Sequence, residues 1–124
     1  MDVTPLIPAG RQVVETYGPA GFRVSGVSFS GSILVFPDRT ELWPVFSLAE
    51  ADLGRFAAVA EHGDVSILLL GCGKRMAPIP LALRNGLRSR GIVVEPMDTG
   101  AACRTYNVLL AEERRVAAAL IRIA

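Results

Sequence analysis

The chain of 124 residues is 51% hydrophobic and 20% charged, with a formal net charge of +1. This length and apolar content predict a single domain, residues 1–124, whose core needs neither disulfides nor metal, and they exclude a disordered chain. The near-neutral charge argues against a dedicated nucleic-acid-binding protein.

No apolar run approaches the ~18 residues of a membrane span, and no signal peptide is evident. We therefore expect a cytoplasmic protein that does not insert into a membrane. Residues 1–12 are expected to form a loosely attached N-terminal segment. The two cysteines, Cys72 and Cys103, are predicted to be free thiols.

Charge is unevenly distributed along the chain. Residues 1–62 carry four basic and seven acidic side chains, whereas residues 63–124 carry nine basic and five acidic ones. All the basic residues are arginines except Lys74. Such an asymmetry can orient a binding partner.

The first part of the chain has the pattern of strands and turns. Residues 12–17 are predicted as a strand that ends at the turn signal Gly18-Pro19. Residues 22–29 alternate apolar with small or polar side chains, which predicts one further strand with a bulge at Gly26.

A small antiparallel meander is expected to follow. Ser30-Gly31 is predicted to close a hairpin into a strand over residues 33–36. Pro37-Asp38 then turns the chain into a strand over residues 41–43. Pro44 is expected to end that strand or to mark it as an edge strand.

From residue 47 the hydrophobic period becomes helical. Ser47 and Glu50 have the spacing of a capping box, and Asp52 is an alternative N-cap. The helix is expected to end at Gly63. Its apolar face is predicted to consist of Leu53, Phe56, Ala57 and Ala60.

Two strands and two helices are predicted beyond that helix. Residues 65–70 form an apolar run broken only by Ser66, which is typical of a strand covered on both faces. A helix beginning near Pro80 and ending at Gly91 precedes a second buried strand over residues 92–95. Asp98 or Thr99 can then cap a helix that runs through Leu110.

The charged residues 112–115 are expected to form a break or a solvent-facing turn before the apolar run 116–121. The alternation of helices and strands predicts an α/β layer with right-handed crossovers.

The loop over residues 71–75, with sequence Gly-Cys-Gly-Lys-Arg, follows a predicted buried strand and precedes a helix. Ligands of open α/β sheets bind at such strand ends, and glycine backbone N–H groups can approach an anion there. The loop lacks the P-loop and dinucleotide patterns, since Leu68 and Met76 stand where glycines would be needed and Arg75 where Ser or Thr would be. Two interpretations of this loop remain: a tight strand-to-helix connection, or an anion-binding site.

A second polar group lies over residues 97–107. Helix capping explains Asp98, but parallel pairing of the two buried strands would bring this cap to the 71–75 loop. Arg104, Thr105 and Asn107 lie on the next helical turns. A buried Arg104 or Asn107 would need hydrogen-bond partners, which the loop carbonyls could supply. The group is therefore either a structural network or a pocket wall.

Thiol chemistry, metal binding and nucleophilic catalysis are indicated more weakly by the sequence. Cys72 and Cys103 are expected at the same sheet edge, either as small buried apolar residues or as a redox pair. No zinc site and no Ser-His-Asp triad are expected, because the one histidine, His62, falls at the opposite end of the sheet. Arg75, Arg84 and Arg88 can form a solvated basic stripe. We expect no metal and no cofactor.

The sequence also resembles a known family. It is similar, over roughly residues 13–121, to small single-domain α/β proteins that include a mitochondrial respiratory complex I assembly factor and a vertebrate adipogenesis-associated protein. Many bacterial members have no assigned function. The resemblance rests on residues 21–26, 31–37, Trp43, 69–75, 91–95 and, as the most specific segment, 97–112.

The resemblance implies a three-layer α/β fold, in which a mixed central sheet is flanked by helices and accompanied by an N-terminal antiparallel β unit. It implies no catalytic activity, and it implies function through protein contacts. Lys74 and Arg104 depart from the mitochondrial pattern. The residues that match the family pattern better are Gly71, Gly73, Arg75, Asp98, Thr99, Thr105 and Asn107.

The leading hypothesis is therefore a non-enzymatic accessory or assembly-factor-like protein that binds a protein partner. One alternative is a small anionic ligand bound at residues 71–75 and 97–107. Another is a thiol-dependent enzyme that uses Cys72 or Cys103. The sequence does not identify the partner or the oligomeric state.

Overall fold

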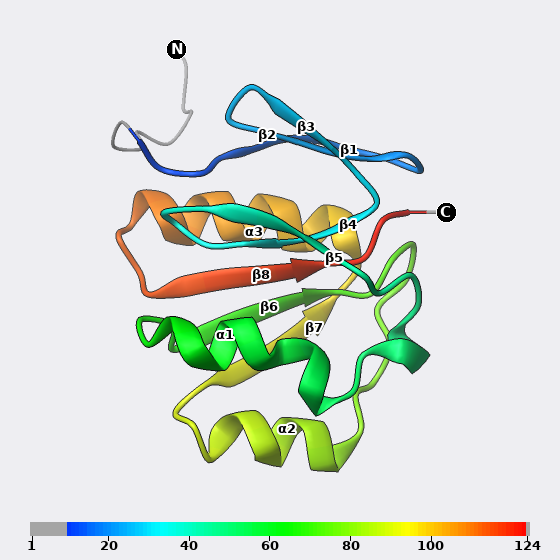
Figure 1. The fold of residues 1–124 in the computed structure, drawn as a ribbon, viewed down its shortest axis with the longest axis vertical. Coiled ribbons are helices and arrows are strands. Elements are labelled where there is room, and N and C mark those ends of the chain that lie inside the picture. The colour runs from blue at the N-terminus through cyan, green and yellow to red at the C-terminus, as the bar shows by residue number, and fades with distance from the viewer. Residues whose placement is uncertain (1–9, 124) are drawn as a thin grey trace.

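The computed structural model describes residues 10–123, which form two sheets and their covering helices (Figure 1). The three-stranded sheet has the order β1-β2-β3, and the five-stranded sheet has the order β5-β4-β8-β6-β7. The elements in chain order are β1 (Val14–Tyr17), β2 (Gly21–Val24), β3 (Val27–Ser30), β4 (Ser32–Val35), β5 (Thr40–Trp43), the 3-10 helices η1 (Leu48–Glu50) and η2 (Leu53–Phe56), α1 (Ala57–His62), β6 (Ile67–Gly71), α2 (Leu81–Arg88), β7 (Val93–Met97), α3 (Thr99–Ala111) and β8 (Val116–Leu120). Most of the segment 1–12 lies outside the described residues.

The five-stranded sheet is the middle of three layers. Along β4, Leu34 belongs to the core that η2, α1 and α2 cover, whereas Ile33 and Val35 face α3 and the three-stranded sheet. Successive strand residues point to opposite faces, so this sheet is buried on both sides. The predicted three-layer α/β fold with a mixed sheet is confirmed.

β8 joins the two halves of the sheet. It pairs antiparallel with β4 and parallel with β6, and all five of its residues are buried. The sequence pattern does not decide the element type of the apolar run 116–121, since a short apolar run fits a buried strand or a buried helix segment equally well. Its three alanines, residues 117–119, are all buried between the two cores.

Two turn assignments in the first half were wrong. Residues 22–29 form two strands, because Ser25 and Gly26 adopt φ of 44° and 86° and reverse the chain between β2 and β3. Ser30 and Gly31 do not close a hairpin; they carry the chain from the three-stranded sheet to β4 in the other sheet. Alternating residues on both sides of a two-residue turn look like one continuous strand.

The turn at Pro37-Asp38 is confirmed, and β5 ends before Pro44, as predicted. β5 is also an edge strand of its sheet. Of the two predicted buried strands, β6 lies inside the sheet and is buried from Leu68 onward, as expected. β7 instead lies at the other edge, and Val93 is 45% exposed. The apolar residues 92–94 therefore overstated the burial of this strand.

The predicted helix after residue 50 begins as a 3-10 turn. Asp52, the alternative N-cap, accepts the backbone N–H of Arg55, and Gly63 ends α1 with a φ of 81°. Phe56 and Val59 are buried, whereas Leu53 and Ala57 are exposed. The predicted apolar face was wrong at those two positions because the 3-10 turn, with ~3 residues per turn, shifts the helical phase.

We expect Ala118→Leu to lower the free energy of unfolding by about 1–3 kcal/mol, because a fully packed central strand has no room for a larger side chain. Denaturant unfolding followed by circular dichroism measures the change. Ala82→Leu on the exposed face of α2 is the matched control and should stay within about 0.5 kcal/mol of the parent. Equal stability of the two variants would contradict a close-packed β8.

Candidate functional site

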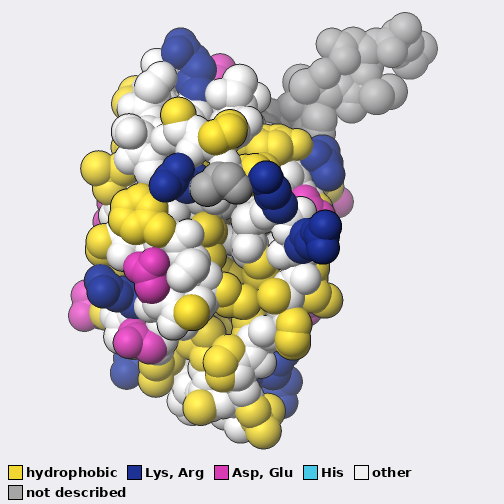
Figure 2. Space-filling view, turned by 90° about the vertical axis from the view of Figure 1, so that its right-hand side faces the viewer, with side chains coloured by type: hydrophobic (Ala, Val, Ile, Leu, Met, Phe, Trp, Pro, Cys, Tyr) yellow, Lys and Arg dark blue, Asp and Glu magenta, His cyan; other side chains and the backbone are white. Residues whose placement is uncertain are grey.

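The candidate site lies where the parallel strands end. β6 and β7 are parallel neighbours, as predicted, and Gly71 at the end of one is the register partner of Met97 at the end of the other. Figure 2 shows this end of the molecule: hydrophobic side chains gather in the lower middle, and Lys and Arg side chains lie mainly in the upper half.

Thr99 holds three segments together at this edge. Its Oγ1 donates to the carbonyl of Ile121 at 2.6 Å and accepts the N–H of Gly73 at 2.9 Å, while its own N–H donates to the Gly73 carbonyl at 2.8 Å. Thr99 is fully buried. The end of β8, the 71–75 loop and the start of α3 are thus locked to one another.

Gly71 belongs to the same close contact. A Cβ at this position would lie 2.9 Å from Thr99 Oγ1 and 3.0 Å from Thr99 Cα. Asp98 caps α3 by accepting the N–H of Ala101 at 2.9 Å, as expected. Gly71, Gly73 and Thr99 therefore meet at this edge, whereas the Asp98 side chain bonds within its own helix.

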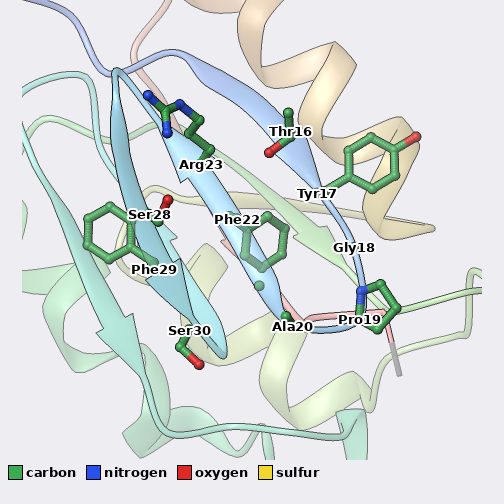
Figure 3. Close-up of a pocket in the computed structure, with 11 residues that line it drawn as sticks. Thr16, Tyr17, Gly18, Pro19, Ala20, Phe22, Arg23, Ser28, Phe29 and Ser30 are labelled. Atoms are coloured by element: carbon green, nitrogen blue, oxygen red, sulfur yellow. The ribbon is translucent and has the colours of Figure 1, made fainter.

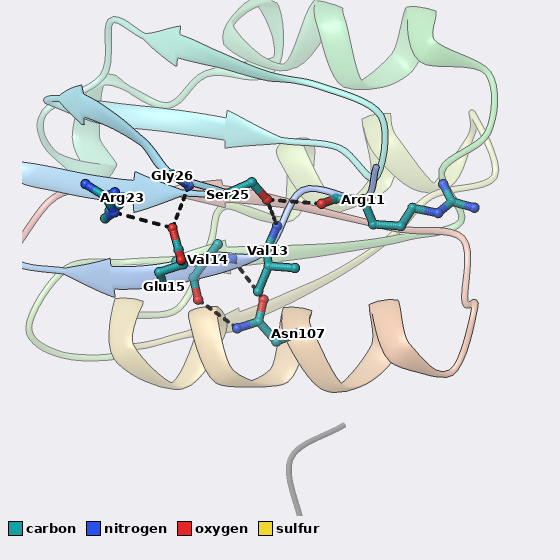
Figure 4. Close-up of polar contacts among 8 residues, drawn as sticks. All are labelled: Arg11, Val13, Val14, Glu15, Arg23, Ser25, Gly26 and Asn107. Carbon is teal, nitrogen blue, oxygen red and sulfur yellow. Dashed lines mark hydrogen bonds and ion pairs between the residues drawn. The ribbon is translucent and has the colours of Figure 1, made fainter. Parts of the chain in front are cut away.

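Asn107 lies two helical turns further along α3 and contacts β1 (Figure 4). Its Oδ1 accepts the N–H of Val14 at 3.1 Å, and its Nδ2 donates to the Val14 carbonyl at 2.8 Å. Arg104 also turns to the N-terminal sheet, because its Nη1 donates to the hydroxyl of Tyr17 at 3.0 Å. The expectation that the loop carbonyls would satisfy Asn107 and Arg104 was wrong.

Thr105 is half-buried on α3, and the structure does not bring it to the loop with Gly73. Lys74 and Arg75 are exposed, and neither takes part in an ion pair within residues 10–123. Their side chains are therefore available to a partner or ligand. Whether Arg75 and its neighbours bind one stays a prediction.

The two thiols lie in separate cores. Cys72 packs with the core under α1 and α2, and Cys103 lies in the core between α3 and the opposite face of the sheet. Burial raises the pKa of the Cys103 thiol to about 12, although the nearby Arg104 charge opposes the shift. The alternative of a redox pair is therefore wrong, and Cys103 is a small buried apolar residue, as the other interpretation expected.

His62 lies at the far end of the sheet, as expected. Its ring stacks on Phe36 with centroids 4.6 Å apart, and its Nε2 lies 2.8 Å from Asp38 Oδ1. This contact lowers the pKa of Asp38. Over residues 10–123, no three His, Cys, Asp or Glu side chains are grouped so as to hold a metal ion.

A hollow of about 480 Å³ lies along the three-stranded sheet, away from the predicted site (Figure 3). Its polar lining includes the hydroxyls of Thr16, Ser28 and Ser30, and the one charged side chain there, Arg23, pairs with Glu15 at 3.5 Å. The sequence pattern offered no signal for this hollow, because its residues match ordinary strands and turns.

We expect Thr99→Val to lower the free energy of unfolding by about 1–3 kcal/mol, because it leaves the buried Gly73 N–H and Ile121 carbonyl without their partner. Denaturant unfolding measures this loss. Thr105→Val, a change of the same shape on the same helix, should alter stability by less than about 0.5 kcal/mol. A Thr99→Val variant as stable as Thr105→Val would show that the interlock does not support the fold.

We expect a thiol reagent at neutral pH to modify Cys72 before Cys103, because Cys103 is 3% exposed and its thiolate is disfavoured. Mass spectrometry of the native protein measures the order of labelling. In denaturant both thiols should react. Prompt labelling of Cys103 in the folded chain would contradict this account.

The comparisons with known proteins agree with this architecture. The family model described as "Protein of unknown function (DUF498/DUF598)" matches residues 14–121. An uncharacterized protein of Rhodobacter capsulatus is 40% identical over 113 residues, which cover 91% of this chain and 86% of that protein. NADH dehydrogenase [ubiquinone] 1 alpha subcomplex assembly factor 3 of Danio rerio is 34% identical over 110 residues and 88% of this chain, and the match spans 63% of that longer protein.

Solved structures show the same fold. The crystal structure of a Bartonella henselae protein, described as an outer membrane protein, superposes with a TM-score of 0.86 at 36% identity and covers 96% of this chain and all of that one. A Mth938-like domain from Bordetella pertussis superposes with a TM-score of 0.82 at 29% identity, over 98% of this chain and 92% of that one. In agreement with the resemblance seen in the sequence, the chain belongs to the DUF498/DUF598 family.

Proposed function

We propose that this chain is a non-enzymatic accessory protein that acts by contact with another protein, in the manner of an assembly factor. Relatives named as assembly factors support this proposal, although the chain spans less than two thirds of the Danio rerio protein.

The proposal rests mainly on the exposure of large apolar side chains beside β5. Leu42 and Phe46 are 61% and 52% exposed, and both line a hollow of about 210 Å³ beside β5. Large apolar side chains that share one surface hollow are typical of a binding surface, whereas singly scattered ones are not.

The polar residues of the predicted site support the same reading, because most of them have a structural task. Thr99 joins three segments, Asn107 binds the backbone of β1, and Asp98 caps α3. These side chains hold the scaffold on which an exposed surface is presented.

A small anionic ligand at residues 71–75 is the second candidate. Lys74 and Arg75 favour it, because both are exposed and neither makes an ion pair with any side chain of the described part, residues 10–123. The N–H of Gly73, however, is already bonded to Thr99. Such a ligand would be held by the two basic side chains at the surface.

A cytoplasmic location is part of the proposal. The free thiols of Cys72 and Cys103 support a reducing compartment. Among residues 10–123, no helix has both the length and the apolar character that crossing a bilayer requires. Because a solved relative is described as an outer membrane protein, fractionation of cells that express the tagged chain is the direct check.

To test the function, the tagged full chain is cross-linked in its own cells at native abundance, purified and sized. We expect one reproducible complex of fixed stoichiometry with a second protein, because an accessory protein of this kind works through a stable contact. A folded domain of similar size with the same tag is the control. Recovery of the chain without any reproducible partner would contradict the proposal.

A further inference from the structure

β5 is an open edge of the central sheet. Beside its turn, the N–H of Phe36 donates to the carbonyl of Arg39, and hydrogen-bonded pairs alternate along an antiparallel ladder. The backbone of Glu41 therefore faces β4, whereas the N–H and C=O groups of Thr40 and Leu42 point away from the sheet. No backbone partner for these outward groups lies among residues 10–123.

Two other sheet edges are closed by side chains. On β1, the Asn107 amide bonds both the N–H and the carbonyl of Val14, as a neighbouring strand would. On β7, Arg84 Nη1 donates to the Val94 carbonyl at 3.2 Å, and Pro96 has no N–H to offer. Natural sheets block their edges by such means to prevent pairing with other chains.

β5 also has a hollow on either side. One hollow of about 210 Å³ lies where β3 leads into β4 and is lined by Leu42, Pro44 and Phe46. Another of about 210 Å³ lies on the α1 side and is lined by Glu41, Leu42 and Ala58. An added strand places alternate side chains on opposite faces, so these hollows match its side-chain period.

We propose that β5 binds an extended segment of the partner protein, which adds to the sheet as a sixth strand. The outward groups of Thr40 and Leu42 bond its backbone, and its alternate apolar side chains fill the two hollows. This inference rests on the proposed function and names the surface through which the contact is made.

Charge specifies the segment further. Residues 38–62, which include β5, contain five acidic residues and two arginines, and Arg39 pairs with Asp38 and Glu41. Arg122 adds a third arginine over the ring of Phe46, so acidic side chains still outnumber basic ones beside β5. A segment with lysine or arginine beside its apolar positions complements this surface. A second copy of β5 fits less well, because antiparallel pairing about Glu41 would set two glutamates opposite each other.

The test selects ligands for the full chain from a phage-displayed library of random peptides of about nine residues, the upper range of a strand. We expect enriched peptides to alternate apolar residues and to carry basic flanks. In the complex with a synthetic selected peptide, the amide protons of Thr40 and Leu42 should become protected from exchange, while those of Glu41 and Trp43, already paired with β4, change little.

Leu42→Pro removes one outward N–H that β4 does not use, and it should weaken peptide binding by about tenfold or more, or about 1.4 kcal/mol. Leu81→Ala, at another exposed leucine on α2, is the control and should bind as the parent does. The exchange measurement on the parent chain keeps the test decisive if the proline variant fails to fold.

Several results would overturn the inference: no enrichment, protection at Ser28 and Ser30 of β3, or protection of Thr40 and Leu42 in the free chain together with dimerisation. Cross-linking to the cellular partner distinguishes a failure of this inference from a failure of the proposed function. If the cross-linked complex forms equally well with Leu42→Pro, the protein contact stands and the β5 surface is wrong. If no partner is recovered but peptides protect β5, the proposed function is wrong.

Discussion

The pairing of β8 between β4 and β6 is the constraint on which the rest of the molecule depends. It joins an antiparallel half, built from the first part of the chain, to a parallel half built from the second. β8 follows the other four strands of this sheet along residues 10–123, so the sheet is complete only when this strand inserts in its middle. Thr99 then secures the end of this strand through the carbonyl of Ile121.

The same architecture explains why polar residues gather at one edge without forming an open site. The end of β8, the 71–75 loop and the start of α3 meet there. Their buried backbone N–H and C=O groups need hydrogen-bond partners. Thr99 supplies these partners in one place, and Asn107 supplies them to β1 on the other side of α3. The most specific segment of the family resemblance, residues 97–112, is therefore also the segment that fixes the layers to one another.

Much of the fold could be predicted from local patterns. The cap at Asp98, the turn at Pro37-Asp38 and the buried strand β6 follow from turn chemistry, capping and hydrophobic period. The candidate site was predicted in part: Gly73 and Thr99 meet, but Asn107 and Arg104 pair with the N-terminal sheet. That partner lies about 90 residues away in the chain, and no local pattern encodes such a contact.

The sequence by itself determined the class of the fold, the family and the position of the strand ends, because each depends on short-range periodicity or on recognisable segments. Only the tertiary structure decided that β8 is central and that the two thiols lie in separate cores. It also decided which edges are closed and that β5 is left open. Strand order and edge coverage arise from contacts between segments that are distant in the chain. Local sequence patterns do not encode such contacts, so only the tertiary structure shows them.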